Sequence, residues 1–294
     1  MADGGEGTLA VFGGPNRTTI VSGPLGDPVE AGWRLSGKTA VIEMATASGI
    51  ALVGDPKDND PMAASSYGTG ELIAAAVESG AKRVIVGVGG SATTDGGLGA
   101  VRALNLARLS GVEILVACDV RIGFLEAATV FAPQKGASPA EVALLERRLE
   151  RLAQVYLEEH GVDVTSIVGG GAAGGLAGGL AAIGATVMSG FELLADERHL
   201  LDDMESAALV ITGEGFVDAE SFDGKVVGSV VDAAHEMGVA SFVVAGEIYD
   251  NVARSPAGAP VDAVSLTERF GHDRAMTETT VCIEEVVLER LSNA

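Results

Sequence analysis

The stretch Ala81-Lys-Arg-Val-Ile-Val-Gly-Val-Gly-Gly-Ser-Ala-Thr-Thr-Asp-Gly-Gly97 decides the fold class of this chain. Its first part is a short apolar run that predicts a buried strand, and the glycines that follow predict a loop. Residues 95–109, which read DGGLGAVRALNLARL, predict a helix directly after this loop. A buried strand that leads into a helix through a glycine loop is typical of α/β proteins with a parallel sheet.

The same strand pattern recurs on both sides of this stretch. Apolar runs bounded by turn residues predict strands at 20–22, 29–33, 39–45, 112–120, 208–215, 241–247 and 263–266. Most of these runs do not alternate polar and apolar residues, so we expect a mainly parallel sheet covered by helices on both faces. Ligands of such sheets bind at the carboxyl ends of the strands, where the glycines and carboxylates of this chain cluster.

Two helices have clear signals at their N-termini. In the helix expected within residues 65–80, Thr69 is placed to act as the cap. In the helix expected within residues 138–161, Ser138 and Glu141 have the spacing of a capping box. Helices of this kind, placed between the apolar runs, supply the layers that a parallel sheet needs.

The composition of the chain excludes several classes of partner. The formal net charge of the 294 residues is −22 and the pI is near 4.4, so nucleic acid and anionic membranes would be repelled. Cys118 and Cys282 have no metal-binding spacing and the start has no signal-peptide pattern, which predicts a reduced, cytoplasmic protein. Four scattered histidines predict no zinc site. The uncharged segment 164–190 is rich in Gly and Ala with few large apolar residues, so it predicts a buried loop and helix rather than a membrane span.

The glycine loop after the first strand has the features of an anion site. Backbone N–H groups and a helix N-terminus would face an anion there, and Ser91, Thr93 and Thr94 add hydroxyl donors. Asp95 suits a general base or a Mg²⁺ contact. The alternative, in which Asp95 caps the helix and the glycines serve packing, is equally compatible with the loop taken alone.

The same loop also matches a dinucleotide-binding pattern. Gly87, Gly89 and Ala92 form G-x-G-x-x-A, and Asp119 at the end of the next strand could meet a ribose. This pattern supports a second hypothesis, an oxidoreductase that uses a nucleotide cofactor.

Three further loops carry residues suited to phosphate chemistry. GGGAAGG at 169–175 allows close approach of a phosphate or of another backbone, with packing at least as well supported. The segment 212–225 contains Glu214 and Asp218 and is not a Walker A loop. Lys135, next to a glycine on a very acidic chain, is a candidate contact for a phosphate or a carboxylate. Several such loops after strands indicate phosphoryl transfer, whose catalysis rests on positioning and charge neutralisation.

Eight motifs, taken in order, resemble one family. They are DGGEGT (3–8), TAVIEMATASG (39–49), YGTGELI (67–73), VIVGVGGSATTDGG (84–97), ACDV (117–120), FAPQKGAS (131–138), GAAGGLAGG (171–179) and VITGEGFVD (210–218). Together they resemble the bacterial type I glycerate kinases, the glycerate 2-kinase family. The match runs to about residue 246 and is looser beyond it.

The resemblance implies a two-lobed α/β fold in which Rossmann- or flavodoxin-like lobes, at 1–200 and 201–294, enclose an interlobe cleft. It also implies ATP-dependent phosphorylation of D-glycerate, with Mg²⁺, to a phosphoglycerate for which we favour the 2-phospho isomer. The partners are then ATP and D-glycerate, with no nucleic acid and no membrane, and a homodimer is left open. A non-catalytic homologue that binds a small acid remains a third hypothesis.

The resemblance also places particular residues around the cleft. As catalytic residues we expect Asp95, Asp218 and Lys135, with the two aspartates as Mg²⁺ contacts and Lys135 on a phosphate or on the substrate carboxylate. As binding residues we expect Asp3, Glu6, Glu43, Gly89, Gly90, Ser91, Thr93, Asp119, Gly171, Gly174, Gly213 and Glu214.

The chain departs from the family pattern at its start. The family normally begins with a strand, a loop of the type APDSFK and a helix before DGGEGT, and these precede nothing here because DGGEGT begins at residue 3. A chain without them is expected to be less stable and less active than an extended chain, because that loop carries an Asp and a Lys expected in the cleft.

Overall fold

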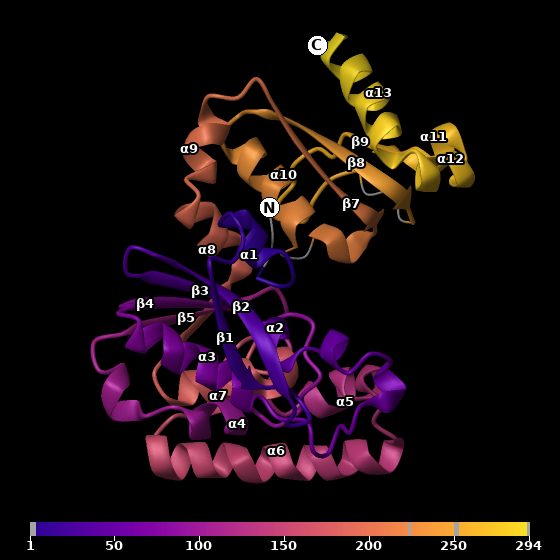
Figure 1. Cartoon of the computed structure of the whole chain (residues 1–294). Coiled ribbons are helices and arrows are strands. Elements are labelled where there is room, and N and C mark those ends of the chain that lie inside the picture. The colour runs from indigo at the N-terminus through magenta and orange to yellow at the C-terminus, as the bar shows by residue number, and fades with distance from the viewer. Residues whose placement is uncertain (1–3, 223–224, 250–252, 293–294) are drawn as a thin grey trace. The chain divides into compact units, whose positions relative to one another are not determined.

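The computed structural model describes residues 4–222, 225–249 and 253–292 (Figure 1). The chain forms two compact units, Met1–Leu194 and Ala195–Ala294. The lobe boundary expected from the sequence, after residue 200, falls at the start of α9 (Leu200–Glu205) in the second unit.

The first unit is built on a six-stranded sheet. Its strands are β1 (Arg17–Ser22), β2 (Pro28–Ser36), β3 (Thr39–Glu43), β4 (Arg83–Gly87), β5 (Glu113–Cys118) and β6 (Thr186–Ser189). They are ordered β1-β2-β3-β4-β5-β6, antiparallel from β1 to β3 and parallel from β3 to β6. The mainly parallel sheet is therefore confirmed. Its strand order follows the chain, without the reversal that marks a Rossmann fold.

Helices connect these strands and cover the sheet. They are α1 (Thr8–Val11), α2 (Ala45–Ser48), α3 (Tyr67–Glu78), α4 (Leu98–Ala103), α5 (Ala127–Phe131), α6 (Pro139–His160), α7 (Ala172–Ala182) and α8 (Gly190–Glu197). Short 3-10 helices lie at Ile50–Leu52, Pro56–Asp58, Leu106–Leu109, Pro133–Lys135 and Val164–Ser166. Figure 1 shows α3, α4 and α7 under the sheet and the long α6 beneath them.

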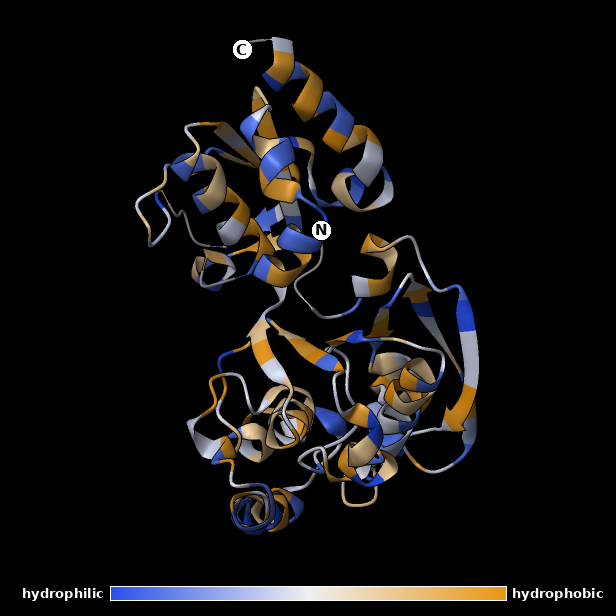
Figure 2. Ribbon diagram, turned by 90° about the vertical axis from the view of Figure 1, so that its left-hand side faces the viewer, coloured by the Kyte–Doolittle hydropathy of each residue, from blue (hydrophilic) through white to orange (hydrophobic). Residues whose placement is uncertain are grey.

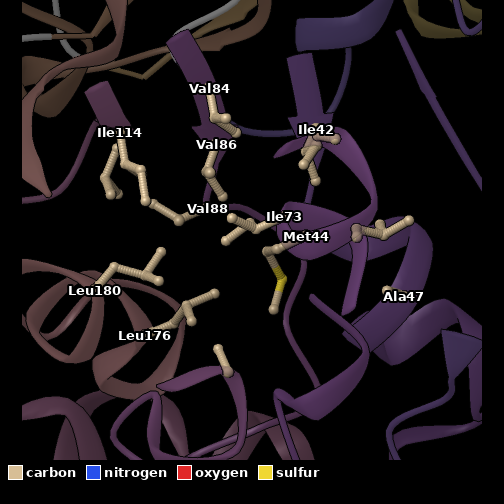
Figure 3. Packing of buried hydrophobic residues seen from close by; sticks show 14 of the residues in the cluster. Ile42, Met44, Ala47, Ile73, Val84, Val86, Val88, Ile114, Leu176 and Leu180 are labelled. Atoms are coloured by element: carbon tan, nitrogen blue, oxygen red, sulfur yellow. The ribbon is translucent and has the colours of Figure 1, made fainter. Parts of the chain in front are cut away.

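The two faces of the sheet have separate cores, because successive strand residues point to opposite sides. On one face, Ile42 and Val86 pack with Ile73 of α3 and with Leu176 and Leu180 of α7 (Figure 3). On the other face, the residues next to them in the strands pack with α1 and α8: Val41, Ile85 and Leu115 contact Leu9 and Leu193. Strands that are apolar on both sides are what the unbroken runs predict.

Two predictions about helix starts had different outcomes. The capping box of α6 is confirmed: Ser138 and Glu141 exchange side-chain and backbone hydrogen bonds. Thr69 as the cap of α3 is wrong, because the helix begins two residues earlier, at Tyr67. Thr69 is instead buried, and its hydroxyl lies 2.9 Å from that of Ser48.

The second unit has a smaller parallel sheet. Its strands β7 (Leu209–Val217), β8 (Ala240–Ile248) and β9 (Ala263–Ser265) lie in the order β7-β8-β9. Val231 of α10 (Val226–Glu236) packs on one face of this sheet. Leu266 of α11 (Leu266–Phe270) and Cys282 of α13 (Thr279–Ser292) pack on the other, and α12 spans His272–Thr277.

Apolar and polar residues are distributed as this layering requires. Figure 2 shows α13, next to the C-terminus, with polar and apolar turns in alternation, as expected of a helix with one buried side. Over the ranges that the structure describes, every helix is too short or too polar to span a bilayer. The Gly- and Ala-rich segment forms the buried helix α7 and then β6, a strand that the sequence did not predict.

Candidate active site

A pocket of about 360 Å³ opens in the first unit at the carboxyl ends of β4 and β5. Gly89, Gly90 and Ser91 line it from the loop after β4, and Asp119 lines it from the end of β5. Lys135 completes the polar part of the wall. Ligands are expected at this end of a parallel sheet, and the pocket gathers five of the residues predicted for the site.

Lys135 is the buried cation of this pocket, with 4% of its surface exposed. Its Nζ donates hydrogen bonds to Ser91 Oγ and to the Thr93 carbonyl, each 2.7 Å long. Burial lowers the pKa of the Lys135 amine from 10.5 to about 7, and the nearby Asp95 carboxylate offsets part of this effect. An anion that binds next to this amine will therefore favour its protonated form near neutral pH.

The backbone around Lys135 is held by Asn59, a residue that the sequence did not point to. Its Nδ2 donates to the Lys135 carbonyl at 2.8 Å and to the Ala92 carbonyl at 3.1 Å, and the side chain is buried. Gly136, with φ +95°, ends the short helix after Lys135, and a Cβ there would lie 2.3 Å from the Pro56 carbonyl oxygen. Asn59 lies in a polar loop, and only its distant partners, 33 and 76 residues away, distinguish it.

The glycine loop is fixed by a neighbouring loop as well as by β4. Gly49 and Ser91 form an antiparallel bridge, with hydrogen bonds of 2.8 Å from Ile50 N to the Gly90 carbonyl and 3.0 Å from Ala92 N to the Ser48 carbonyl. The helix that follows, α4, begins only at Leu98. In the dinucleotide fingerprint the glycine loop opens directly into the helix. The loop at Gly87–Ala92 does not have that geometry.

The DGGEGT loop lies against this glycine loop, as the resemblance implies. A Cβ on Gly89 would come within 2.6 Å of the Gly5 Cα, and one on Gly90 would come within 2.6 Å of Glu6 Oε1. Glu6 is thus beside the pocket, while Asp3 lies outside the described residues. Glu43 anchors the helix after the loop, because its Oε1 accepts a 2.7 Å hydrogen bond from the Leu9 N–H.

Asp95 is a structural acceptor in this fold. Its Oδ1 accepts from Gly97 N at 3.1 Å, and its Oδ2 accepts from Ser66 N and Ser66 Oγ at 2.9 Å and from Gly99 N at 3.1 Å. These bonds join the first turns of α3 and α4. Asp95 lines a different pocket from Lys135. The geometry therefore favours the capping alternative over a role as base or Mg²⁺ contact.

We expect Asp95→Asn to lower the free energy of unfolding by about 1–3 kcal/mol, because the new amide group would face N–H donors in place of an acceptor. The turnover number of the folded variant should fall less than about tenfold, since this carboxylate is absent from the Lys135 pocket. Urea unfolding and steady-state kinetics test both parts. Asp163→Asn, at an exposed Asp that accepts from Thr165 N, is the control. A thousandfold loss of turnover with unchanged stability would restore the base assignment.

The second glycine motif serves packing. A Cβ on Gly171 would lie 2.3 Å from the Gly123 carbonyl oxygen, and one on Gly174 would lie 1.9 Å from the Thr93 carbonyl oxygen. Ala173, between them, has φ 52° and lines the pocket. The predicted binding role of the two glycines is thus filled by backbone contacts that bring α7 against the loop of Lys135.

The remaining predicted residues lie along β7 of the second unit. Gly213 has no room for a side chain, since a Cβ would lie 2.1 Å from the Val244 carbonyl oxygen. Glu214 is half-buried, and its Oε1 has no hydrogen-bond partner in the part of the chain that the structure describes. Hydrogen bonds from the Ser221 N–H and hydroxyl to Asp218 lower the pKa of the Asp218 carboxyl. Their joining to the Lys135 pocket stays a prediction.

The strand-end pocket, the glycine loop and the buried lysine define this chain as an α/β protein that binds a small anionic ligand. The chain belongs to the glycerate kinase family, whose model matches residues 1–109 and 106–291. It is 41% identical over 291 residues to glycerate 2-kinase of Escherichia coli K12, covering 86% of this chain and 76% of that protein. It is 39% identical over 287 residues to a glycerate kinase of Halalkalibacterium halodurans, covering 84% of this chain and 75% of the relative.

A solved structure supports the same assignment. A crystal structure described as glycerate kinase 2 from Salmonella typhimurium LT2 matches with a TM-score of 0.77 and 34% identity, over 99% of this chain and 88% of that one. The resemblance drawn from the eight motifs is thus confirmed.

Proposed function

We propose that this protein is a kinase that transfers the terminal phosphoryl group of ATP to the 2-hydroxyl of D-glycerate. The observation that carries the proposal is the buried Lys135 at the strand-end pocket of a chain that belongs to the glycerate kinase family. Phosphoryl transfer depends on neutralising charge on the transferred group and on aligning the acceptor, and a fixed ammonium next to glycine-loop N–H groups can do both. We place the reaction in the cytoplasm, consistent with two free cysteines.

Within this pocket we assign separate roles to the polar groups. The Lys135 ammonium, oriented by Ser91 and Thr93, would hold the carboxylate of glycerate or the phosphoryl group in transfer. Asp119, which lines the same pocket, is the carboxylate placed to contact the substrate hydroxyl or a metal ion. Because Asp95 is engaged elsewhere, Asp218 is the predicted acid that we retain as candidate base.

The fit of Mg²⁺ is a matter of donor number. Over the residues that the structure describes, no group of three His, Cys, Asp or Glu side chains could hold a metal ion alone. Mg²⁺ in kinases usually takes one or two carboxylates, with waters and substrate phosphates filling its other positions. Single carboxylates such as Asp119 and Asp218 fit that pattern, and the ion would neutralise charge on the phosphates.

The decisive test is the reaction itself. The purified chain with D-glycerate, ATP and Mg²⁺ should release ADP, and ³¹P NMR of the product should show 2-phosphoglycerate and not the 3-phospho isomer. L-Glycerate should be a poor acceptor. ADP release that does not depend on glycerate, or no release by a chain shown to be folded, would contradict the proposal. Binding without turnover would instead support a non-catalytic homologue.

The pKa of Lys135 predicts how substrate binding depends on pH. The amine has a pKa of about 7 in the free protein, while the carboxylate of glycerate stays ionised well below that pH. Below pH 7 the ammonium is already formed, so the dissociation constant for D-glycerate should be nearly constant. Above pH 7 binding must take up a proton, so the constant should rise about tenfold per pH unit.

Calorimetry in buffers of different ionisation enthalpy measures this proton uptake directly. At pH 8, close to one proton should enter the complex per molecule of D-glycerate bound. Lys135→Met should bind weakly and with no such proton uptake. Proton release on binding at pH 8 would contradict the assigned role of the amine.

A further inference from the structure

A second pocket of about 630 Å³ lies in the first unit between α4 and α6. It shares no lining residue with the pocket of Lys135. Thr94 and Asp95 form one side of it, Leu98 and Arg102 of α4 form another, and α6 forms the long wall. In Figure 1 this helix is the outermost element of the first unit on that side of the sheet. The proposed kinase activity makes no use of this pocket.

Four arginines line this pocket on a chain that carries 41 acidic and only 19 basic side chains. They are Arg102, Arg147, Arg148 and Arg151. Among the described residues, none of the four forms an ion pair with a carboxylate. Elsewhere on this protein, arginines such as Arg108 and Arg274 are paired with glutamates.

The hydrogen bonds of these arginines leave most of their donors available. Arg148 donates to the Met62 carbonyl at 2.8 Å, Arg151 to Gln154 Oε1 at 3.0 Å, and Arg147 to the Ala143 carbonyl of its own helix at 3.0 Å. Each guanidinium has five N–H donors. The arginines thus present positive charge and free donors whose only bonded acceptors are neutral oxygens.

The floor of the pocket is apolar. Leu145 and Leu149 are 1% exposed, and with Leu98 and Val155 they form a hydrocarbon surface beneath the guanidinium groups. Leu144, also in the wall, leaves 44% of its surface exposed. The one acid in the lining, Asp95, already accepts four hydrogen bonds from Ser66, Gly97 and Gly99, which stabilise its charge.

We propose that the α4–α6 pocket is a binding site for a small organic anion with an apolar body, such as a medium-chain carboxylate. The unpaired guanidinium groups match a carboxylate or another oxyanion, which they can bind bidentately. The leucine floor matches an aliphatic or aromatic body, because burial of apolar area drives its binding. A hydrophilic anion such as glycerate lacks the second feature, and a nucleic acid would meet the acidic remainder of the protein.

Octanoate is the ligand for the first test. Isothermal titration calorimetry with the full chain should show saturable binding that weakens as salt is raised. Octylammonium, with the same chain and the opposite charge, should bind at least ten times more weakly. Affinity should rise from butyrate to octanoate by up to about fourfold for each buried methylene. Equal affinity for both charges, or no dependence on chain length, would overturn the proposal.

Variants then locate the site. Arg148→Gln with Arg151→Gln should lower octanoate affinity at least tenfold, and Arg102→Gln should lower it from the opposite wall. Arg17→Gln, at an exposed arginine of β1, is the matched control and should leave affinity unchanged. Saturating D-glycerate and Lys135→Met should also leave it unchanged. Octanoate that competes with glycerate, or that binds the α6 double variant normally, would overturn the assignment of this pocket. Thermal melts verify that each variant is folded.

Discussion

Lys135→Met is expected to lower kcat/KM for D-glycerate by at least about 100-fold, the size of effect seen when a preorganised charged donor is removed from an active site. The amine is buried and its Nζ is held by Ser91 and Thr93, so no water or neighbouring side chain can easily take its position. Methionine has a similar length but neither the charge nor the donors. Steady-state kinetics at pH 6.5, where the amine of the parent is mostly protonated, gives the clearest comparison.

The control for this change is Lys82→Met, at an exposed lysine before β4, which should keep the activity of the parent. Stability separates chemistry from structure. Lys135→Met removes a buried amine but leaves Thr93 and Ser91 oxygens without its hydrogen bonds, a loss of about 1–3 kcal/mol at most. A variant that is folded at the assay temperature and retains full kcat/KM would rule out Lys135 as a catalytic residue.

The parts of the fold that the sequence predicted well are those that local pattern determines. β3, β4 and β5 are apolar on both faces, and the start of α6 has a cap that needs only residues 138–141. β6 was missed because its four residues, 186–189, follow a long Gly- and Ala-rich segment and show no distinct apolar run of their own. α4 is shorter than expected because the chain turns at Leu104 before a separate 3-10 helix.

The site shows the limit of local pattern more clearly. The position of Lys135 near Ser91 followed from a shared family pattern, but its burial depends on Asn59, which is distant from both in sequence. Asp95 could be a base or a cap on the sequence of its loop alone. The deciding partner is Ser66, 29 residues earlier, whose N–H and hydroxyl both bind the Asp95 carboxylate. Contacts of this kind form only when the whole unit has folded.

Gly174→Ala is expected to lower the free energy of unfolding by about 3 kcal/mol or more, the largest stability effect that we predict. The position has φ +67°, where a side chain strains the backbone, and a Cβ would lie 1.9 Å from the Thr93 carbonyl oxygen. Backbone on both sides of the contact must therefore move. That carbonyl also accepts a hydrogen bond from Lys135, so kcat/KM should fall together with stability.

Gly184→Ala separates these two causes. Gly184 follows the same helix and has φ +99°, but a Cβ there would meet nothing within 4 Å, so only the backbone strain of about 1 kcal/mol should remain. Urea unfolding of both variants measures the difference, which we assign to the collision with the Thr93 carbonyl. Because Gly184 is remote from the pocket lining, its variant should keep full activity below its melting temperature. Equal losses of stability in the two variants would show that α7 can shift away from the loop, and the close contact between Gly174 and Thr93 would then not be what positions Lys135.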